Sequence, residues 1–313
     1  MTRGSALAAV VETVDLTKRF RDHLAVDRVT LRIGQGESWA ILGPNGSGKT
    51  TLLGMLLGVI RPTSGRIQLF GEYDGVRDHR ARLRIGATLE TPNYYPYLSG
   101  YDNLQITSTI KRVPKSAISR ALETVGLSNR ARDPVKAYSL GMKQRLVIAG
   151  ALLSQPELVI LDEPLNGLDP EGMYEMREVL RRVHAEGRAL LIASHLIHEV
   201  ERTCTHVALI RAGRVLYSGT IDELIPIGSA VFVRALDSEN LLQRAAGYPA
   251  CTTVRAEGDG AVIGIADGDI ASLNRWLVAQ GLDVIQLEPR RPTLEEVYLS
   301  LTGAREQAPV AVG

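Results

Sequence analysis

The feature that most constrains the fold of this chain is a glycine-rich octapeptide, Gly43-Pro44-Asn45-Gly46-Ser47-Gly48-Lys49-Thr50. It matches the P-loop pattern in full and lies between an apolar segment, 38–42, typical of a buried strand, and a helical run, 51–60. Glycines let the backbone curl so that successive amide groups and the N-terminus of the following helix point at one anion. The sequence therefore predicts a polyphosphate cradle in which Lys49 neutralises the terminal phosphates and Thr50 ligates Mg²⁺.

A second group of motifs lies farther along the chain. The apolar strand 158–161 ends in Asp162 and Glu163, an arrangement that puts one acid on Mg²⁺ and the next beside the water that attacks a γ-phosphate. The segment 138–145 opens a helix with a serine and a glycine, which suits a phosphate, and the apolar strand 191–194 ends on His195. Because kinases, GTPases and motors share the P-loop, these further residues are needed to narrow the class.

The composition excludes several other classes of protein. The chain has 313 residues, and 36 basic against 35 acidic side chains leave a formal net charge of +1, so we expect no nucleic acid partner. Cys204 and Cys251 form neither a disulfide framework nor a zinc motif, which fits a reducing cytosol. Apolar runs are far shorter than the about 20 residues of a membrane span, so we expect a cytoplasmic protein.

The N-terminal part of the chain reads as one large α/β domain over residues 10–225. Alternating β-branched residues in 10–16 and 25–33 predict an antiparallel strand region ahead of the P-loop. Residues 90–151 change to a helical pattern, with Ser116 as an expected N-cap and Gly126 as a helix stop. Buried parallel strands are expected at 158–161 and 189–193. We therefore expect an α/β core with an antiparallel β region and a helical insertion.

A second, smaller domain is expected over residues 229–303, after a break at 225–229 that contains Pro226 and Gly228. Its pattern reads strand, helix, strand, strand, helix, strand, which is the order of the ferredoxin-like α+β arrangement. A last helix, 294–301, begins with Thr293 and Glu296 at capping-box spacing. The tail, 304–313, has no pattern and is expected to be loose.

With these motifs in this order, the sequence resembles the ABC ATPase family of P-loop NTPases from about Val11 to Leu224. The resemblance implies an adenine-stacking aromatic, Phe20, and a Walker A loop that includes Thr51. It also implies Asp162 as the Walker B aspartate, Glu163 as the catalytic glutamate, and His195 as the switch histidine. The implied ATP-binding residues of one chain are Phe20, Gly43, Pro44, Asn45, Gly46, Ser47, Gly48, Lys49, Thr50 and Thr51, and the implied catalytic set is Glu163, His195 and Lys49.

The resemblance also implies partners. In the family two subunits pack head to tail, so that the signature segment 139–144 of one completes the ATP site of the other. Ser139, Gly141 and Asp169 would then act in trans on ATP, while the implied cofactors of each site are ATP and Mg²⁺. The implied assembly is a homodimer on the inner face of the cell membrane, attached to a separate ABC permease that contacts the helical insertion.

Two positions depart from the family pattern. Glu90 stands where the family normally has glutamine. In the family signature Leu-Ser-Gly-Gly-Gln, the first, third and fifth positions are occupied here by Tyr138, Leu140 and Met142. A carboxylate at position 90 can still ligate Mg²⁺, although it adds negative charge near phosphates. With Glu163 intact we expect a working hydrolase. These departures and the segment 291–298 resemble bacterial export ATPases of the bacitracin and lantibiotic resistance type.

Two alternative functions remain open from sequence: a soluble ABC ATPase acting on ribosomes or DNA, and a non-hydrolysing regulatory ATP-binding module. The single cassette with a short insertion and no basic excess favours the transport subunit over the first. Other polar and aromatic groups are expected to carry no chemistry. We interpret Tyr94, Tyr95 and Tyr97 as a packed loop that meets the permease. Four further residues are interpreted as solvated polar side chains and not as a metal site: His198, Glu199, Glu201 and His206.

Overall fold

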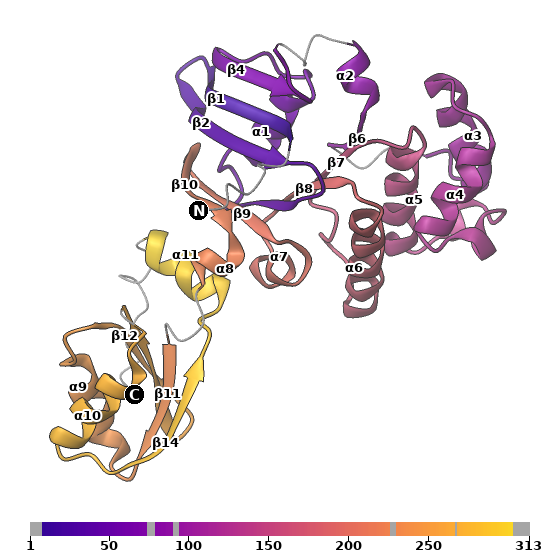
Figure 1. Ribbon diagram of the computed structural model, residues 1–313. Coiled ribbons are helices and arrows are strands. Elements are labelled where there is room, and N and C mark those ends of the chain that lie inside the picture. Colours follow the sequence, from indigo (N-terminus) through magenta and orange to yellow (C-terminus); the bar gives the residue numbers. More distant parts are fainter. Residues whose placement is uncertain (1–7, 74–78, 90–93, 226–229, 267, 303–313) are drawn as a thin grey trace. The chain divides into compact units, whose positions relative to one another are not determined.

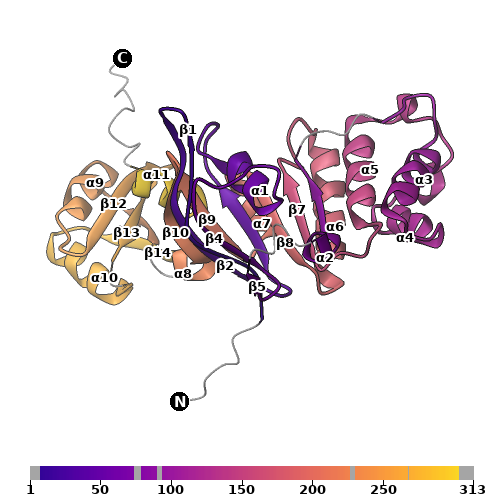
Figure 2. The same cartoon turned by 90° about the horizontal axis from the view of Figure 1, so that it is seen from above.

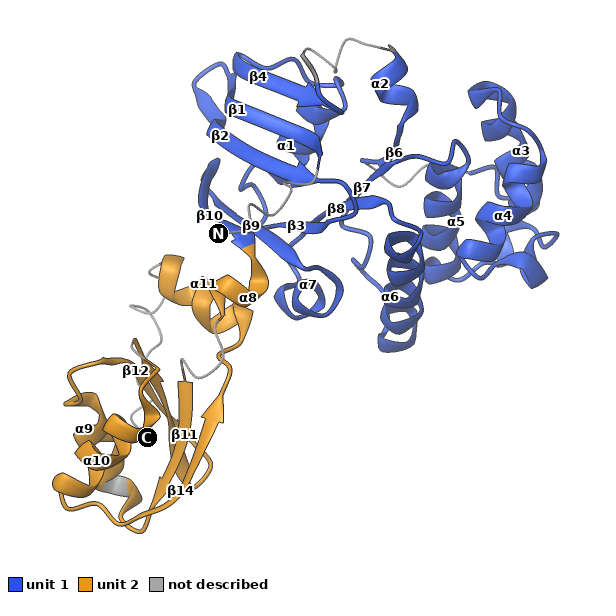
Figure 3. Cartoon of the chain, in the orientation of Figure 1, with its two compact units in different colours: residues 1–219 blue, residues 220–313 orange. Residues whose placement is uncertain are grey.

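The computed structural model describes residues 8–73, 79–89, 94–225, 230–266 and 268–302. The chain divides into two compact units, residues 1–219 and 220–313 (Figure 3). The division falls just before helix α8 (Ile221–Leu224), a few residues ahead of the break expected at 225–229. Helix α8 belongs with the second unit because it packs against that unit's last helix, α11 (Leu294–Thr302).

A six-stranded sheet forms the centre of the first unit, with the strand order β10-β9-β3-β8-β7-β6 (Figure 1). Strand β3 pairs in parallel with β8 and β9, and β7 pairs in parallel with β6 and β8. Every residue of β3 and of β8 is buried, as in sheets covered on both faces. The strands expected at 38–42, 158–161 and 189–193 are confirmed, and the bounds are β3 (Ser38–Leu42), β6 (Ile85–Thr88), β7 (Leu158–Asp162), β8 (Ala189–Ser194), β9 (His206–Arg211) and β10 (Arg214–Thr220).

A second sheet of the first unit is antiparallel, with the order β2-β1-β4-β5. Strand β1 (Ala9–Phe20) pairs with β2 (His23–Gly34) and with β4 (Ser64–Leu69), and β4 also pairs with the short β5 (Glu72–Tyr73). The antiparallel region expected ahead of the P-loop is therefore confirmed. Thr13 lies buried inside this sheet, where its hydroxyl donates to Val29 O and accepts from the amide of Leu31.

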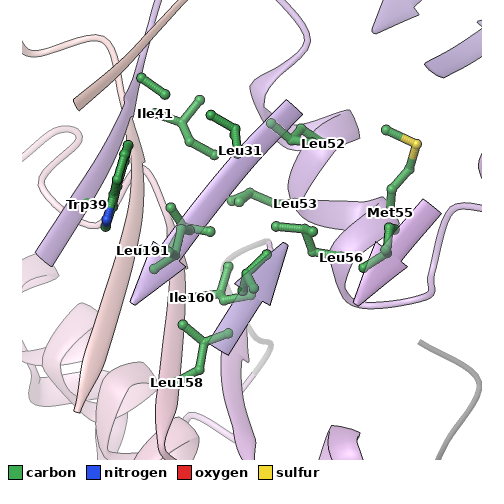
Figure 4. Packing of buried hydrophobic residues seen from close by; sticks show 14 of the residues in the cluster. Leu31, Trp39, Ile41, Leu52, Leu53, Met55, Leu56, Leu158, Ile160 and Leu191 are labelled. Carbon is green, nitrogen blue, oxygen red and sulfur yellow. The ribbon is translucent and has the colours of Figure 1, made fainter. Parts of the chain in front are cut away.

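Helix α1 (Lys49–Leu56) lies between the two sheets (Figure 2). Leu52, Leu53, Met55 and Leu56 are at most 1% exposed and share one core cluster with residues of both sheets. Figure 4 shows these side chains between Leu31 of β2 and the apolar residues of the central sheet. These buried side chains contact core residues of both sheets, so both sheets hold α1 in place, while Thr50 at its start is exposed.

The end of helix α1 corrects the helical run expected over 51–60. The helix ends at Leu56, and Gly58 adopts a left-handed φ of 72° just beyond the C-cap residue Leu57. The amides of Gly58 and Val59 then donate to Met55 O and Gly54 O. This is the ordinary glycine-terminated helix end, in which left-handed backbone stops the helix and satisfies its last carbonyls.

The expected helical insertion is present as helices packed beside the central sheet (Figure 1). The prediction that Ser116 is the N-cap of its helix is wrong. The chain turns one residue earlier, where Ala117 N donates to Pro114 O, so Lys115 is the N-cap and Ser116 lies in the first turn. The helical elements of the first unit are α2 (His79–Leu83), α3 (Gly100–Lys111), α4 (Ser116–Thr124), η1 (Ser128–Arg130), η2 (Val135–Ala137), α5 (Leu140–Leu152), α6 (Pro170–Ala185) and α7 (Ile197–Thr203).

The second unit has the expected ferredoxin-like order of strand, helix, strand, strand, helix, strand. Its four-stranded sheet has the order β12-β13-β11-β14, and each neighbouring pair is antiparallel. The capping box of α11 is confirmed, because Thr293 N donates to Glu296 Oε2 at 2.9 Å and Glu296 N donates to Thr293 Oγ1. The bounds are β11 (Ala230–Ala235), α9 (Ser238–Ala246), β12 (Cys251–Glu257), β13 (Gly260–Ile265), α10 (Ile270–Ala279) and β14 (Val284–Arg290).

Among the described residues, no helix has the length and apolar character required to cross a lipid bilayer.

The burial of α1 generates a stability prediction. Leu53→Ala removes a fully buried side chain and leaves a cavity between the sheets, so we expect the free energy of unfolding to fall by about 2–5 kcal/mol. Val59→Ala is the control, because Val59 is 73% exposed and its truncation should change stability by less than about 0.5 kcal/mol. Denaturant unfolding of both variants measures the difference. Equal stabilities would show that α1 is not the centre of this core.

Candidate functional site

The P-loop joins the end of β3 to the start of α1, at the edge where the parallel strands end. Two of its glycines are required by close backbone contacts. A Cβ at Gly48 would lie 2.3 Å from Ala25 O, and a Cβ at Gly43 would lie 2.2 Å from Ile210 O. Gly48 also has a left-handed φ of 104°. The loop is therefore held in its curl by the carbonyls of β2 and β9, which only glycine can approach.

Gly46 serves the loop differently. Its φ is 79°, but a Cβ there would have no atom within 4 Å, so this side of the loop faces open space. The hydroxyl of Ser47 is buried and has no hydrogen-bond partner among the described residues. Buried hydroxyls normally find a partner, so an unpaired one beside an open glycine turn fits a bound phosphate.

Lys49 lies folded into the loop, with its side chain 6% exposed. Its Nζ donates to Gly43 O at 2.7 Å and to Pro44 O at 3.3 Å, and it lies 3.4 Å from Glu163 Oε1. Two carbonyls and one carboxylate therefore balance its charge. A phosphate that entered the loop would compete with these oxygens for the same ammonium group.

Thr50 and Asp162 come together as the Mg²⁺ assignment requires. Thr50 Oγ1 donates to Asp162 Oδ2 at 2.7 Å, and Asp162 Oδ1 is buried without a partner among the described residues. Burial of this carboxyl raises its pKa above the usual value. The described residues contain no cluster of three or more acidic, His or Cys side chains suited to a metal. A hydroxyl and one carboxylate are oxygen ligands of the kind that Mg²⁺ prefers, so these residues fit the ion.

Glu163 and His195 form a pair at the ends of neighbouring strands. Glu163 Oε2 lies 2.9 Å from His195 Nδ1, while the other carboxylate oxygen faces Lys49. Glu163 has a left-handed φ of 49°, uncommon for a residue with a side chain, and its amide donates to Ala193 O of β8. The strand geometry thus holds this carboxylate between a lysine and a histidine.

The predicted adenine-side residue, Phe20, lies at the end of β1 and is 45% exposed. The ammonium group of Lys18 lies 4.7 Å from the centre of its ring. An exposed aromatic face with one side on a cation has its other side available for stacking.

The residues assigned in trans lie at the starts of two helices. Ser139 is the N-cap of α5, where its Oγ accepts from Met142 N at 3.2 Å, and Asp169 is the N-cap of α6, where its Oδ1 accepts from Gly172 N at 2.9 Å. Leu140, the residue after Ser139, is 49% exposed. No hydrogen bond or ion pair recorded for the described chain joins these residues to Lys49 or Glu163, and their action on ATP stays a prediction.

Several other expectations are corrected or lie outside the described structure. Glu90 falls outside the described residues. Glu199 is not solvated, because it is 9% exposed and accepts from Arg177 at 2.7 Å. His206 is half-buried and stacks on Trp39 at 4.8 Å. Sequence reasoning also missed the carbonyls of Ala25 and Ile210, since backbone atoms of remote strands leave no signal in a motif.

The curled loop, the Asp–Glu strand end and the histidine of the next strand, on a parallel sheet with an antiparallel partner sheet, define a P-loop ATPase of the ATP-binding cassette class. Residues 26–166 match the ABC transporter family model. The chain is 36% identical over 304 residues to the bacitracin transport ATP-binding protein BcrA of Bacillus licheniformis, covering 95% of this chain and 98% of that protein. It therefore belongs to the family of ABC transporter ATP-binding proteins.

Two further comparisons agree. The chain is 40% identical over 208 residues to the lantibiotic transport ATP-binding protein SrtF of Streptococcus pyogenes, covering 66% of this chain and 90% of that protein. The solved structure of cbiO1 from Clostridium perfringens, part of the ABC transporter complex cbiONQ, aligns with a TM-score of 0.64 at 30% identity, covering 69% of this chain and 90% of that chain. The chain is thus the ATP-binding, ATP-hydrolysing subunit of a transporter.

The two loop glycines generate a paired prediction. Gly48→Ala should lower the free energy of unfolding by more than about 2 kcal/mol, because left-handed strain of about 1–2 kcal/mol adds to a clash with Ala25 O. Gly46→Ala carries only the strain but places a methyl group on the open side of the loop, so it should fold and bind ATP weakly. Denaturant unfolding without nucleotide and ATP titration separate the two effects. Equal destabilisation would contradict the role given to Ala25.

Proposed function

We propose that this chain hydrolyses MgATP as a head-to-tail homodimer and so drives export by a separate membrane permease. The observation that carries the export assignment is the extent of the likeness to BcrA, which covers 95% of this chain and so reaches well into the second unit. The ATPase core alone is common to the whole family, whereas likeness that extends beyond it points to a narrower group.

The hydrolytic roles follow from the contacts around Glu163. Its carboxylate accepts the proton of the water that attacks the γ-phosphate, and His195, 2.9 Å away, orients that carboxylate. Lys49 leaves the carbonyls of Gly43 and Pro44 and binds phosphate oxygens instead. Thr50 and Asp162 would hold Mg²⁺, which would supply positive charge against the phosphates. Glu163 thus passes from a lysine contact at rest to a water contact during turnover.

The dimer assignment rests on the start of α5. A Cβ at Gly141 would make only ordinary contacts, the nearest 3.6 Å from Leu168 Cδ2, so packing within the chain does not require glycine there. The exposed Leu140 likewise lacks a full complement of neighbours in its own chain. Ser139 and Gly141 are therefore available to approach the triphosphate of a second copy, where a small residue lets the backbone come close.

The permease assignment rests on exposed apolar side chains around α3. Tyr95, Tyr97 and Ile110 are 60%, 80% and 76% exposed, on the helix and the segment that precedes it. Tyr94 is tied down nearby, because its hydroxyl donates to Leu146 O and burial raises its pKa. A fixed loop that presents large apolar groups suits a protein partner. Through that partner the chain would sit in the cytoplasm, peripheral on the inner face of the membrane.

The proposed roles of Glu163 and Lys49 predict that one substitution stops turnover and the other weakens ATP binding. Glu163→Gln keeps the shape of the site but removes the base, so we expect ATP binding to persist, turnover to fall by about 10²- to 10⁴-fold, and ATP to trap a dimer. Lys49→Ala should weaken ATP binding by more than about tenfold. Glu123→Gln on α4 is the matched control, an exposed acid far along the chain from the site. Light scattering with ATP and phosphate release provide the readouts, and parental turnover by Glu163→Gln would refute the base assignment.

Co-purification tests the partner. We expect the tagged chain, extracted from membranes in mild detergent, to retain a multi-helix membrane protein, and Tyr97→Ala/Ile110→Ala to lose it while still binding ATP. Val278→Ala, which removes a 55% exposed apolar side chain of α10, should retain it. Recovery of ribosomes or DNA instead would favour the soluble ABC ATPase alternative. Binding of ATP without phosphate release would favour a regulatory module.

A further inference from the structure

A cavity of about 590 Å³ lies in the first unit, just beyond the end of helix α1. Three of the residues that line it are arginines, Arg61, Arg66 and Arg82, and all three are exposed. The remaining lining residues are small, apolar or hydroxyl-bearing, and they are Gly58, Ile60, Pro62, Thr63, Ser64, Gly65 and Ile67. The described lining residues therefore include three positive charges and no acidic side chain.

The three guanidinium groups have no ion-pair or hydrogen-bond partner among the described residues. Some arginines beside other cavities are paired within the chain. In the cavity of about 760 Å³ between α4 and α6, Arg188 pairs with Glu186, and in the cavity of about 350 Å³ beside α11, Arg255 pairs with Glu296 at 2.8 Å. The cavity beyond α1 is therefore lined by three guanidinium groups that have no partner among the described residues.

The wall of this cavity is fixed before any ligand arrives. Lys18 Nζ donates to Arg61 O at 2.8 Å, the amide of Thr63 donates to Thr17 O at 2.8 Å, and the amide of Arg19 donates to Thr63 Oγ1 at 3.0 Å. Three bonds therefore fasten the segment 61–63 to strand β1. The Thr63 hydroxyl donates to no other described residue, and a fixed wall lowers the entropy lost on binding.

The cavity is separate from the P-loop. The P-loop precedes the first residue of α1, whereas Gly58 and Ile60 follow its last residue. Eight helical residues span about 12 Å, so the two sites lie at opposite ends of the same helix. An anion in the cavity would use none of the residues assigned to ATP.

We propose that this arginine cavity binds a small phosphate-bearing anion. Guanidinium groups bind phosphate through paired, charge-assisted hydrogen bonds, and three of them with a free hydroxyl supply donors on several sides of one group. The volume falls within the range of ordinary ligand sites, which is about 300–1,000 Å³. Two sources share this chemistry, a soluble phosphate compound and the headgroup of an anionic lipid. The inference does not depend on the transport function proposed above.

The test uses the full chain carrying Lys49→Ala, so that the P-loop contributes little anion binding. Inorganic pyrophosphate is titrated by calorimetry, and vesicles of phosphatidylglycerol with phosphatidylcholine are compared with phosphatidylcholine alone by flotation. We expect saturable binding of at least one probe. Removal of the cavity charges by Arg61→Gln/Arg66→Gln/Arg82→Gln should weaken it at least about tenfold. Pyrophosphate binding identifies a soluble ligand, and vesicle binding alone identifies a lipid headgroup.

A charge-matched control removes three exposed arginines that do not line the cavity, Arg112→Gln/Arg120→Gln/Arg202→Gln. Equal loss in the two triple variants would show general charge attraction and overturn the proposal, as would the absence of binding to either probe. Arg82→Gln alone provides a milder variant, for which partial loss is expected. With Lys49 restored, the cavity variant should keep parental ATP turnover, which reports correct folding.

Discussion

The packing of helix α1 between two sheets is the constraint on which the rest of the first unit depends. Its leucines and Met55 are buried in one core cluster with residues of both sheets. Because α1 begins within the P-loop, fixing the helix also fixes the first amides that can meet a phosphate. The contacts of Gly43 and Gly48 with the carbonyls of Ile210 and Ala25 then hold the loop from two further strands. The packing of the core therefore also determines the geometry of the loop.

Charge in the site is organised around a single carboxylate. Glu163 lies between Lys49 and His195, and Asp162, one residue earlier, takes a hydrogen bond from Thr50 instead. The two neighbouring acids therefore contact different partners, which lets one serve a metal and the other a water. One oxygen of Asp162 and the hydroxyl of Ser47 are buried without a partner among the described residues, so both are available to ligands.

Much of the fold could be predicted from sequence because its signals are local. The strand 38–42 is a continuous apolar run that stops at a glycine, and the alternation before it identifies the antiparallel region. Helix ends are harder to predict. Ser116 has the residue type of a cap, but the turn at Pro114 places it inside the helix. The burial of Glu199 depends on Arg177 of another helix, and the walls behind Gly43 and Gly48 are backbone atoms of remote strands. The roles of Ser139, Gly141 and Asp169 involve a second copy of the chain, so their contact with ATP stays a prediction.

The folded position of Lys49 has a consequence for anion binding. At rest its ammonium group is saturated by two carbonyl oxygens and a carboxylate, so a weakly held anion gains little by displacing them. An anion that also accepts hydrogen bonds from the loop amides gains contacts that can offset this loss. The resting contacts of one lysine therefore set a cost that any anion entering the loop must offset.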